Sequence, residues 1–416
     1  MKKAAASIGV AWLITALYYF YQYVLRSAPA VMMPELSEAF GITTTGVAAL
    51  AGLFYYGYSP FSLVAGVALD RFGPRTVVPL GAAVIGVGAL LFASGAGTLA
   101  GAGRFLQGAG GVFALLGSVY LATTYFPASR AATLIGATQM FGMAGGFAGQ
   151  IVVGPAIASG LPWSRFWAGM GIAGLVLCAL LFALLPRAAG ARRAGGLKEA
   201  GVALASVFRN PQSILCGLIA GLLFIPTTIF DMVWGVRYLQ EGHGFDYGEA
   251  VMRSSTVPLG WMIGCPLLGF LSDRLGRRKP VIAVSALVLL GCLAWILYGP
   301  HERLPPYLVG IVAGTASGAA MITYSVIKEA NPPQMSGTAT GVVNFINFTL
   351  SALLGPVFGG LLSQAAAGAE ARNLAHYQAA FQPLLLGVVL AFVLTLLLRE
   401  TGPAVRPREQ LATNNR

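Results

Sequence analysis

Charged residues are scarce in this chain. Only 10% of its 416 residues are Asp, Glu, Lys or Arg, whereas 56% are hydrophobic, and the mean hydropathy is +0.75. A water-soluble domain carries about 25% charged residues, so these charges are too few to cover a soluble surface of this size. Apolar runs of about 18 residues or more recur along the whole length, as lipid-spanning helices require. The sequence therefore predicts an all-α membrane protein.

Residues that hold metals or perform nucleophilic catalysis are also few. The chain has four cysteines, all inside apolar runs and without metal-ligand spacing, and three histidines, all in expected loops. It has no phosphate-binding loop and no G-x-S-x-G motif. An enzyme, an ATP-driven pump, a metal site and a cofactor are therefore not expected. The net charge of +12 does not form a basic face interleaved with aromatic residues, so nucleic-acid binding is not expected either.

The apolar runs predict twelve transmembrane helices separated by short loops that are rich in glycine, proline and charge. The first run follows Lys2 and Lys3 like that of a signal peptide, but it is long, contains Arg26 and offers no clear cleavage site, so we expect it to be retained. The expected spans are 5–32, 45–69, 76–96, 98–124, 132–157, 162–185, 213–238, 248–271, 280–299, 304–327, 338–364 and 378–398.

The basic residues predict the orientation of these spans. With the N-terminus in the cytoplasm, most lysines and arginines fall in cytoplasmic loops, including Arg187, Arg192, Arg193, Lys198 and Arg209 in the long connection after the sixth span. Only five fall outside, namely Arg165, Arg237, Arg253, Arg303 and Arg372. Because lysine and arginine accumulate on the cytoplasmic side, we expect a multi-pass protein of the cell inner membrane with both termini cytoplasmic.

Two loops repeat at nearly the same offset in the two halves. Gly66-Val-Ala-Leu-Asp-Arg-Phe-Gly-Pro-Arg75 follows the second span, and Gly269-Phe-Leu-Ser-Asp-Arg-Leu-Gly-Arg-Arg-Lys279 follows the eighth. Acidic and basic side chains at cytoplasmic helix ends can latch two helical bundles together, or the arginines can simply anchor the membrane face. The duplication favours the latch. Its expected residues are Asp70, Arg71, Arg75, Asp273, Arg274 and Arg277.

These loops, together with Arg104-Phe-Leu-Gln-Gly108, resemble signatures of the major facilitator superfamily. The resemblance covers essentially the whole chain. It implies two six-helix bundles around a central cavity, which opens alternately to the two sides of the membrane. The expected parts are a bundle at 1–185, a cytoplasmic linker at 186–212, a bundle at 213–399 and a cytoplasmic tail at 400–416. One chain suffices for a complete cavity, so a functional monomer is expected.

Arg26 is the strongest candidate for contact with a solute. A charge at the bilayer centre costs about 2.5–3.5 kcal/mol, so it is kept for function by default. Helical spacing places Tyr19, Gln22, Tyr23 and Arg26 on one face, and a guanidinium suits capture of a carboxylate or phosphate. The alternative is an arginine that snorkels to the outer surface.

The segment from Tyr23 to Pro34 resembles the first helix of the organophosphate and organic-anion branch of the superfamily, which implies that Arg26 binds an anion. Phosphate antiporters of that branch carry a second arginine in the seventh helix, where this chain has Asp231. A monoanion, a zwitterion or a neutral polar solute therefore fits better than an organophosphate.

Asp231 and Arg104 are the other charges expected within spans. Asp231 could bind an amine, pair with Arg26 or carry a proton, or it could lie near the outer mouth and pair with Arg237. The R-x-x-x-G context of Arg104 resembles a superfamily position that is often tied to proton coupling, while its alternative role is to structure the fourth helix. Polar and aromatic residues elsewhere are expected to complete the cavity, namely Tyr120, Gln139, Trp234, Trp261, Tyr324, Asn344 and Asn347.

The sequence thus predicts a secondary active transporter of a small organic anion or an amino-acid-like metabolite, coupled to protons. The substrate contacts are expected from Arg26, Tyr19, Gln22, Tyr23, Asp231, Trp234, Tyr324 and Asn344, and proton coupling from Arg104 and Asp231. Two alternatives stay open: an exporter of a larger metabolite such as a siderophore or drug, and a transporter-like sensor of a ligand.

Overall fold

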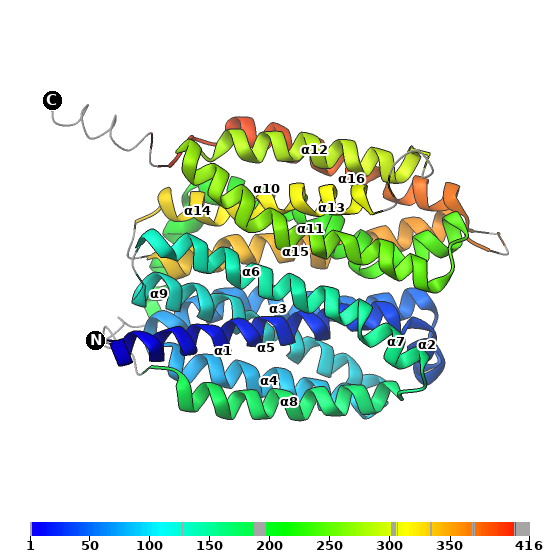
Figure 1. The fold of residues 1–416 in the computed structure, drawn as a ribbon, viewed down its shortest axis with the longest axis horizontal. Coiled ribbons are helices and arrows are strands. Elements are labelled where there is room, and N and C mark those ends of the chain that lie inside the picture. Colours follow the sequence, from blue (N-terminus) through cyan, green and yellow to red (C-terminus); the bar gives the residue numbers. More distant parts are fainter. Residues whose placement is uncertain are drawn as a thin grey trace.

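A computed structural model describes residues 2–126, 128–186, 197–300, 305, 307–332, 335–367, 369, 371–402 and 404. Every regular element in this part of the chain is a helix (Figure 1). Twelve of its segments are long and apolar enough to cross a membrane, in close agreement with the expected spans. The predicted all-α membrane fold is therefore confirmed.

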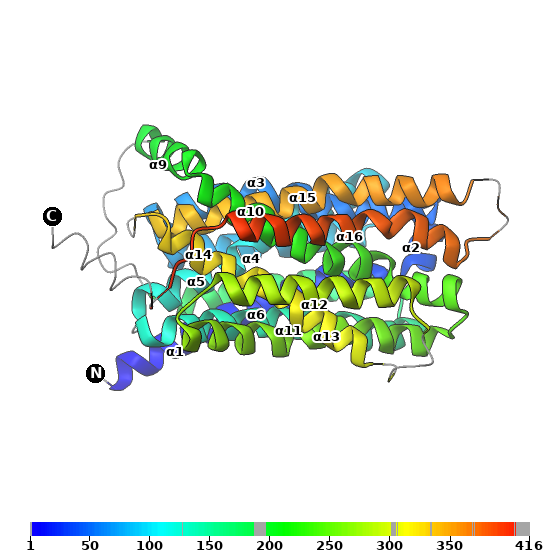
Figure 2. The same cartoon turned by 90° about the horizontal axis from the view of Figure 1, so that it is seen from above.

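The first six spans and their connections run from Lys2 to Leu184. Their helices are α1 (Lys2–Ser27), η1 (Ala28–Val31), α2 (Met33–Phe40), α3 (Thr44–Phe72), α4 (Pro74–Ala93), α5 (Gly97–Tyr125), α6 (Ala128–Ile151), α7 (Val153–Ala158) and α8 (Trp163–Leu184). After them, α9 (Leu197–Arg209) lies within the stretch that the sequence marks as a linker, and Figure 2 shows it to one side of the long helices.

The last six spans run from Pro211 to Leu397. Their helices are α10 (Pro211–Ile225), η2 (Pro226–Gly235), η3 (Tyr238–Gly242), α11 (Tyr247–Leu275), α12 (Lys279–Tyr298), α13 (Leu308–Ser317), η5 (Gly318–Met321), α14 (Ile322–Glu329), α15 (Ser336–Ala365) and α16 (Leu374–Leu397).

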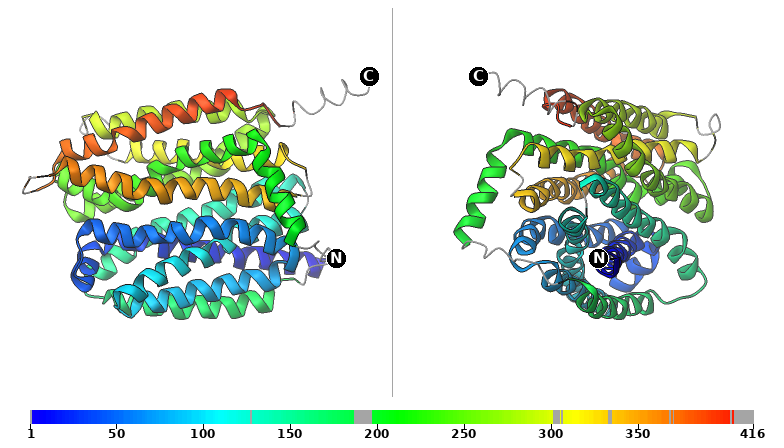
Figure 3. Two further views of the ribbon diagram at one scale, coloured as in Figure 1. Left: turned by 180° about the vertical axis from the view of Figure 1, so that it is seen from behind. Right: turned by 60° about the vertical axis from the view of Figure 1, so that its left-hand side comes forward.

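The spans before α9 gather on one side of the molecule and those after it on the other (Figure 3). The start of α1 and the end of α16 lie at the same end of the molecule, whereas α2 and α7 lie at the opposite end (Figure 1). The two groups meet where α3 packs along α15 and α6 packs along α11. Hydrogen bonds cross the first seam, since Ser59 Oγ lies 2.9 Å from the carbonyl oxygen of Phe345 and Asn344 Nδ2 lies 2.8 Å from Ser62 Oγ.

Glycines bring the backbones of α3 and α5 into direct contact. A Cβ on Gly57 would overlap the carbonyl oxygen of Phe105, and a Cβ on Gly108 would overlap that of Phe54. The second half repeats this reciprocal contact between α11 and α13, where Gly260 faces the Ile311 carbonyl and Gly314 faces that of Val257. Without a hydrophobic driving force in lipid, such close packing holds helices together. The sequence repeat therefore corresponds to a repeated packing contact.

The seventh span departs from α-helical geometry. Pro226 has no backbone N–H to donate, which interrupts the regular ladder, and the backbone continues as a π-helix from Pro226 to Gly235. Long π-helical segments are rare, and short ones are frequent at functional sites. The side chains of η2 therefore point in directions that an α-helical projection of this span does not give.

We expect Gly108→Ala to destabilise the protein, because the new methyl group must push α3 away from α5. Overpacking of this kind costs about 1–3 kcal/mol, which thermal unfolding in detergent will register as a lower transition temperature. Gly101→Ala on the same helix is the control, since its Cβ would meet only Leu53 Cδ1 at 3.4 Å. Equal transition temperatures for the two variants would contradict the contact.

Candidate functional site

Arg26 lies near the end of α1, and its side chain is enclosed by aromatic rings. Only 5% of the Arg26 surface is exposed. The guanidinium carbon lies 4.4 to 5.6 Å from the centres of five rings, which belong to Tyr23, Phe54, Tyr55, Tyr58 and Phe348. These rings come from α1, α3 and α15, so both halves of the chain contribute. Arg26 therefore does not snorkel to the surface.

The guanidinium has aromatic neighbours but no hydrogen-bond partner. Its Nε, Nη1 and Nη2 atoms are buried and unpartnered, and none of the ion pairs among the described residues includes it. Cation–π contacts offset part of the cost of removing this charge from water. They leave its N–H donors unsatisfied, which a folded protein normally avoids. An anion at this position would satisfy them.

Other unpartnered polar atoms belong to the same region. Gln22, one helical turn before Arg26, has neither its Oε1 nor its Nε2 atom hydrogen-bonded, and both are buried. The Tyr58 hydroxyl lies close to the side chains of Arg26 and Asn344 but forms no hydrogen bond of good geometry with them. Asn347 Oδ1, one residue before Phe348, is also unpartnered among the described residues. The region thus offers donors for an anion and an amide pair for hydroxyl groups.

Several of the remaining predicted cavity residues form a hydrogen-bonded frame, whereas Trp261 donates to Thr227 on η2. The Tyr324 hydroxyl donates to Asn344 Oδ1 at 2.7 Å, and Asn344 in turn donates to Ser62 on α3. Tyr19 donates to Gln139 Oε1 at 3.2 Å and stacks edge-on against Tyr23. This frame joins α1 to α6 and α3 to α14 and α15, and it fixes the walls around Arg26.

Arg104 serves a different purpose from Arg26, although both are buried. Its Nη1 donates to the Leu25 carbonyl at 3.0 Å and to Gln107 Oε1 at 2.6 Å, and its Nη2 donates to the Ala51 carbonyl at 3.2 Å. Gln107 then donates to the Gly88 carbonyl. Arg104 therefore ties α1, α3, α4 and α5 together behind the Arg26 site, in agreement with the structural alternative for this residue.

Asp231 lies apart from Arg26 and pairs with neither of the arginines considered for it. Its Oδ1 accepts a hydrogen bond from Ser254 Oγ at 2.9 Å, and its Oδ2 is buried without a partner. It lines a cavity between η2, α11, α12 and α13, together with Tyr238 and Trp295. Arg237 pairs instead with Glu241 at 2.7 Å. Neither of the two pairings considered for Asp231 is present, since its side chain contacts Ser254 of the second group of spans.

Trp234 also lies away from the Arg26 site as a wall of a different cavity, between α3, η2 and α15. The aromatic residues that do enclose Arg26 from α3 and α15 were not predicted. A signal for three of them was present, since Phe54-Tyr-Tyr-Gly-Tyr58 is an unusually dense aromatic run within a span. Phe348 carries no comparable local signal.

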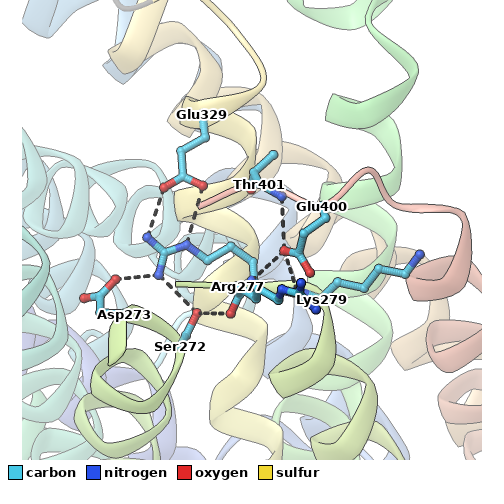
Figure 4. A network of polar contacts seen from close by, with 8 residues as sticks. Ser272, Asp273, Arg277, Lys279, Glu329, Glu400 and Thr401 are labelled. Atoms are coloured by element: carbon cyan, nitrogen blue, oxygen red, sulfur yellow. Dashed lines mark hydrogen bonds and ion pairs between the residues drawn. The ribbon is translucent and has the colours of Figure 1, made fainter. Parts of the chain in front are cut away.

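The loop between α11 and α12 contains an ion-pair cluster centred on Arg278 (Figure 4). Its Nη1 lies 2.5 Å from Asp273 Oδ1, and its Nη2 lies 3.0 Å from Glu329 Oε1 at the end of α14. Burial lowers the pKa of Arg278, but the hydrogen bonds and charges of Glu329 and Asp273 outweigh this and raise it above the ordinary value. Arg278 thus stays charged and joins three helix ends.

Glu400, just after α16, extends this cluster. Its Oε1 accepts hydrogen bonds from the backbone N–H groups of Arg278 and Lys279 at 2.7 and 3.2 Å, so it caps the first turn of α12. Lys279 donates to the Leu396 carbonyl at the end of α16. The first residues of the expected tail are therefore part of the packed structure (Figure 4).

The ion pairs of the second loop belong to Arg278, which is not among the expected latch residues, and they stay within the second group of spans. Arg274 and Arg277 are exposed and form none of the ion pairs among the described residues, since Arg278 takes that part. In the first loop, the guanidinium carbon of Arg71 lies 5.7 Å from the centre of the Phe72 ring. That of Arg75 lies 5.5 Å from the centre of the Phe182 ring. The side chain of Asp70 lies outside the described residues.

Comparison with known proteins assigns the chain to a family. The model of the Major Facilitator Superfamily matches residues 15–353. The chain belongs to the major facilitator superfamily. It is 24% identical to a hexuronate transporter of Bacillus subtilis, over 82% of this chain and 84% of the relative, and 24% identical to a D-galactonate transporter of Escherichia coli, over 82% and 86%.

The fold agrees with this membership. The crystal structure of the proton:xylose symporter XylE, bound to 6-bromo-6-deoxy-D-glucose, superposes with a TM-score of 0.74 at 15% identity and covers 96% of this chain and 97% of that one. The resemblance found in the loops is therefore confirmed, and the chain is a multi-pass membrane transport protein.

Substitution of the two buried arginines should have opposite effects on stability. We expect Arg26→Met to keep or raise the transition temperature without added solute, because it removes a buried charge that has no polar partner. Arg104→Met should lower it, because the Leu25 and Ala51 carbonyls then lose their donor at a cost of about 1–3 kcal/mol each. Thermal unfolding in detergent measures both. A comparable loss in Arg26→Met would make that residue a structural one.

Proposed function

We propose that this protein is a secondary active transporter that moves a small organic monoanion across the cell inner membrane by alternating access. The observation that carries the proposal is the buried Arg26 guanidinium, whose donors form no well-formed hydrogen bond or ion pair with the described residues, although the Tyr58 hydroxyl lies beside it. A carboxylate or sulfonate would accept two parallel hydrogen bonds from it and remove the cost of its burial.

The number of arginines available at the site predicts the charge of the substrate. Arg104 lines the same small space, but its two terminal nitrogens already donate to backbone carbonyls, so Arg26 supplies the guanidinium whose terminal nitrogens are open to a solute. Gln22, Tyr58 and Asn347 supply neutral donors and acceptors that suit hydroxyl groups on the substrate. The two relatives are a hexuronate transporter and a D-galactonate transporter, and both of these solutes are hydroxylated carboxylates. The neutral side chains around Arg26 and the solutes of the two relatives both support a sugar acid or a similar hydroxylated acid as the substrate.

Proton coupling through Asp231 completes the proposal. The carboxylate is 4% exposed, has one unpartnered oxygen and lies beside a cavity. Arg253 lines the same cavity, but it is paired with Glu249, so among the described residues Asp231 has a hydrogen bond from Ser254 and no ion pair. Because Asp231 adjoins Met232 and Val233, which face the space beside Arg26, its protonation can be linked to occupation of the anion site.

The moving parts in this proposal are the bundles at 1–185 and 213–399, which rock against each other along the α3–α15 and α6–α11 seams. The Arg278 cluster holds the ends of α11, α14 and α16 together as one body during this motion. The basic loops support a cytoplasmic location of both termini, and one chain forms the complete site, which supports a functional monomer.

The anion proposal predicts a ligand-dependent rise in thermal stability. Purified protein will be screened with D-galactonate, D-glucuronate, sulfoacetate and the neutral sugar D-galactose. We expect a dose-dependent shift from at least one of the acids and none from D-galactose. Arg26→Gln should weaken binding about 100-fold, because it removes the charged hydrogen bonds, whereas Arg26→Lys should keep part of the affinity.

Arg165→Gln is the matched control, since Arg165 is exposed in the first turn of α8, a helix that contributes none of the rings around Arg26. An acid whose binding survives Arg26→Gln would remove Arg26 from the site. Binding without flux in proteoliposomes would favour a sensor over a transporter.

Proton coupling is tested by Asp231→Asn. In proteoliposomes with an imposed proton gradient, the unaltered protein should accumulate the bound acid, while Asp231→Asn should exchange it across the membrane without accumulation. The amide cannot take up a proton but keeps the size of the carboxyl group. Glu199→Gln on the exposed face of α9 is the control. Full accumulation by Asp231→Asn would place the coupling elsewhere.

A further inference from the structure

A second cavity lies at the end of the molecule opposite the termini, beyond the Arg26 site. Its volume is about 230 Å³, enough for a small organic molecule, whereas the space beside Arg26 measures only about 10 Å³. Small residues create it where α3, η2 and α15 diverge, including Ala48, Ala49, Gly52, Gly355 and Gly359. Side chains of Tyr55, Tyr56, Trp234 and Ser351 add polar and aromatic surface.

A cation lies at the rim of this cavity. Arg372 is half-buried just before α16, and its Nη2 donates to Thr45 Oγ1 at 3.3 Å. Its guanidinium carbon lies 5.5 Å from the centre of the Trp234 ring. Thr45 and Trp234 both line the cavity, so the positive charge is fixed beside it. None of the four ion pairs in the described part of the chain involves Arg372.

The nearby carboxylate does not cancel this charge. Glu241 lies close to Tyr377, as Arg372 does. However, Glu241 is already paired with Arg237 at 2.7 Å and accepts a hydrogen bond from the Tyr377 hydroxyl at 2.7 Å. Its charge is therefore balanced by Arg237, and among the described residues no carboxylate forms an ion pair with Arg372.

One layer of side chains separates the cavity from Arg26. Tyr55 and Val233 each line both the 230 Å³ cavity and the small space beside Arg26. The Tyr55 ring lies against the Arg26 guanidinium at 5.6 Å, and its hydroxyl reaches the Thr228 carbonyl on η2 at 3.4 Å. Rotation of Tyr55 or separation of α3 from η2 would join the two spaces.

We propose that Arg372, Thr45 and Trp234 form an outer binding subsite for an organic monoanion, from which the anion passes Tyr55 to reach Arg26. The transport part of this inference rests on the function proposed above. The guanidinium binds the carboxylate or sulfonate group, and the Trp234 ring and the small residues of α15 accommodate the apolar surface of its body. A fixed charge at a rim raises the local concentration of its counter-ion and the rate of entry.

Charged thiol reagents can test the subsite without knowledge of the substrate. Ala48→Cys places a thiol on the cavity wall, in a protein whose four native cysteines are replaced by alanine. Anionic methanethiosulfonate ethylsulfonate and cationic methanethiosulfonate ethyltrimethylammonium are applied from the side of α2 and α7, and the ratio of their reaction rates is measured. Ser159→Cys, exposed in the loop after α7, is the reference position.

We expect the ratio of the anionic to the cationic reaction rate to be higher at Ala48→Cys than at Ser159→Cys. Arg372→Gln should lower that ratio about fivefold, as removal of one nearby charge requires, while Arg372→Lys should preserve most of it. In the protein that retains Arg372, D-galactonate or sulfoacetate at millimolar concentration should slow the reaction of the anionic reagent with Ala48→Cys. In Arg372→Gln neither acid should slow it. Equal ratios at the two positions, no reaction at Ala48→Cys, or a ratio unaffected by Arg372→Gln would each overturn the subsite.

Two further variants separate this inference from the proposed function. Arg26→Gln should leave the reagent ratio at Ala48→Cys unchanged even though it abolishes tight binding of the acid. Arg372→Gln should keep equilibrium binding at Arg26 but reduce the uptake rate several-fold at low substrate concentration and flatten its dependence on salt. A normal uptake rate and normal salt dependence in Arg372→Gln would deny the subsite any role in entry.

Discussion

A permanent positive charge held among aromatic rings, without a carboxylate beside it, is the constraint on which the rest of this structure depends. Burial of an unpaired charge is unfavourable, and the rings around Arg26 recover only part of that cost. Helix packing must supply the remainder. The backbone contacts of α3 with α5 and of α11 with α13 lie on either side of the site and provide stability that the site itself does not.

Arg104 shows how the fold uses an identical side chain for the opposite purpose. Its two terminal nitrogens donate to carbonyls of α1 and α3 and to a glutamine that reaches α4, while its Nε has no partner among the described residues. The same chemical group is thus a structural tie in one position and an unsatisfied donor in the other. The difference lies in the neighbours, since Arg104 faces backbone and Arg26 faces rings from Phe54 to Phe348.

The sequence predicts the spans and the repeat well, because lipid allows few alternatives to long apolar helices. It also identifies Arg26, because a charge inside a span is costly and therefore conspicuous. It does not identify the rings from α3 and α15, since the packing of distant helices decides which side chains meet. It leaves the partner of Asp231 open, because the apolar pattern does not reveal the π-helix that carries this residue in the seventh span. In the loop between α11 and α12, the sequence does not distinguish Arg277 from Arg278. Only the packing of α14, which brings Glu329 to the loop, decides that Arg278 forms the ion pairs.

The π-helix of η2 also affects how residues of this protein correspond to those of its relatives. A π-helical turn holds about one residue more than an α-helical turn, so this segment equals an α-helix with a residue inserted. Where a relative has an α-helical seventh span, a correct alignment needs a single-residue gap between Pro226 and Gly235. Without that gap, every assignment on one side of it is displaced by one position, which rotates the compared side chains by about 100°. Substrate-contacting positions transferred through the seventh span would then name residues that face a neighbouring helix.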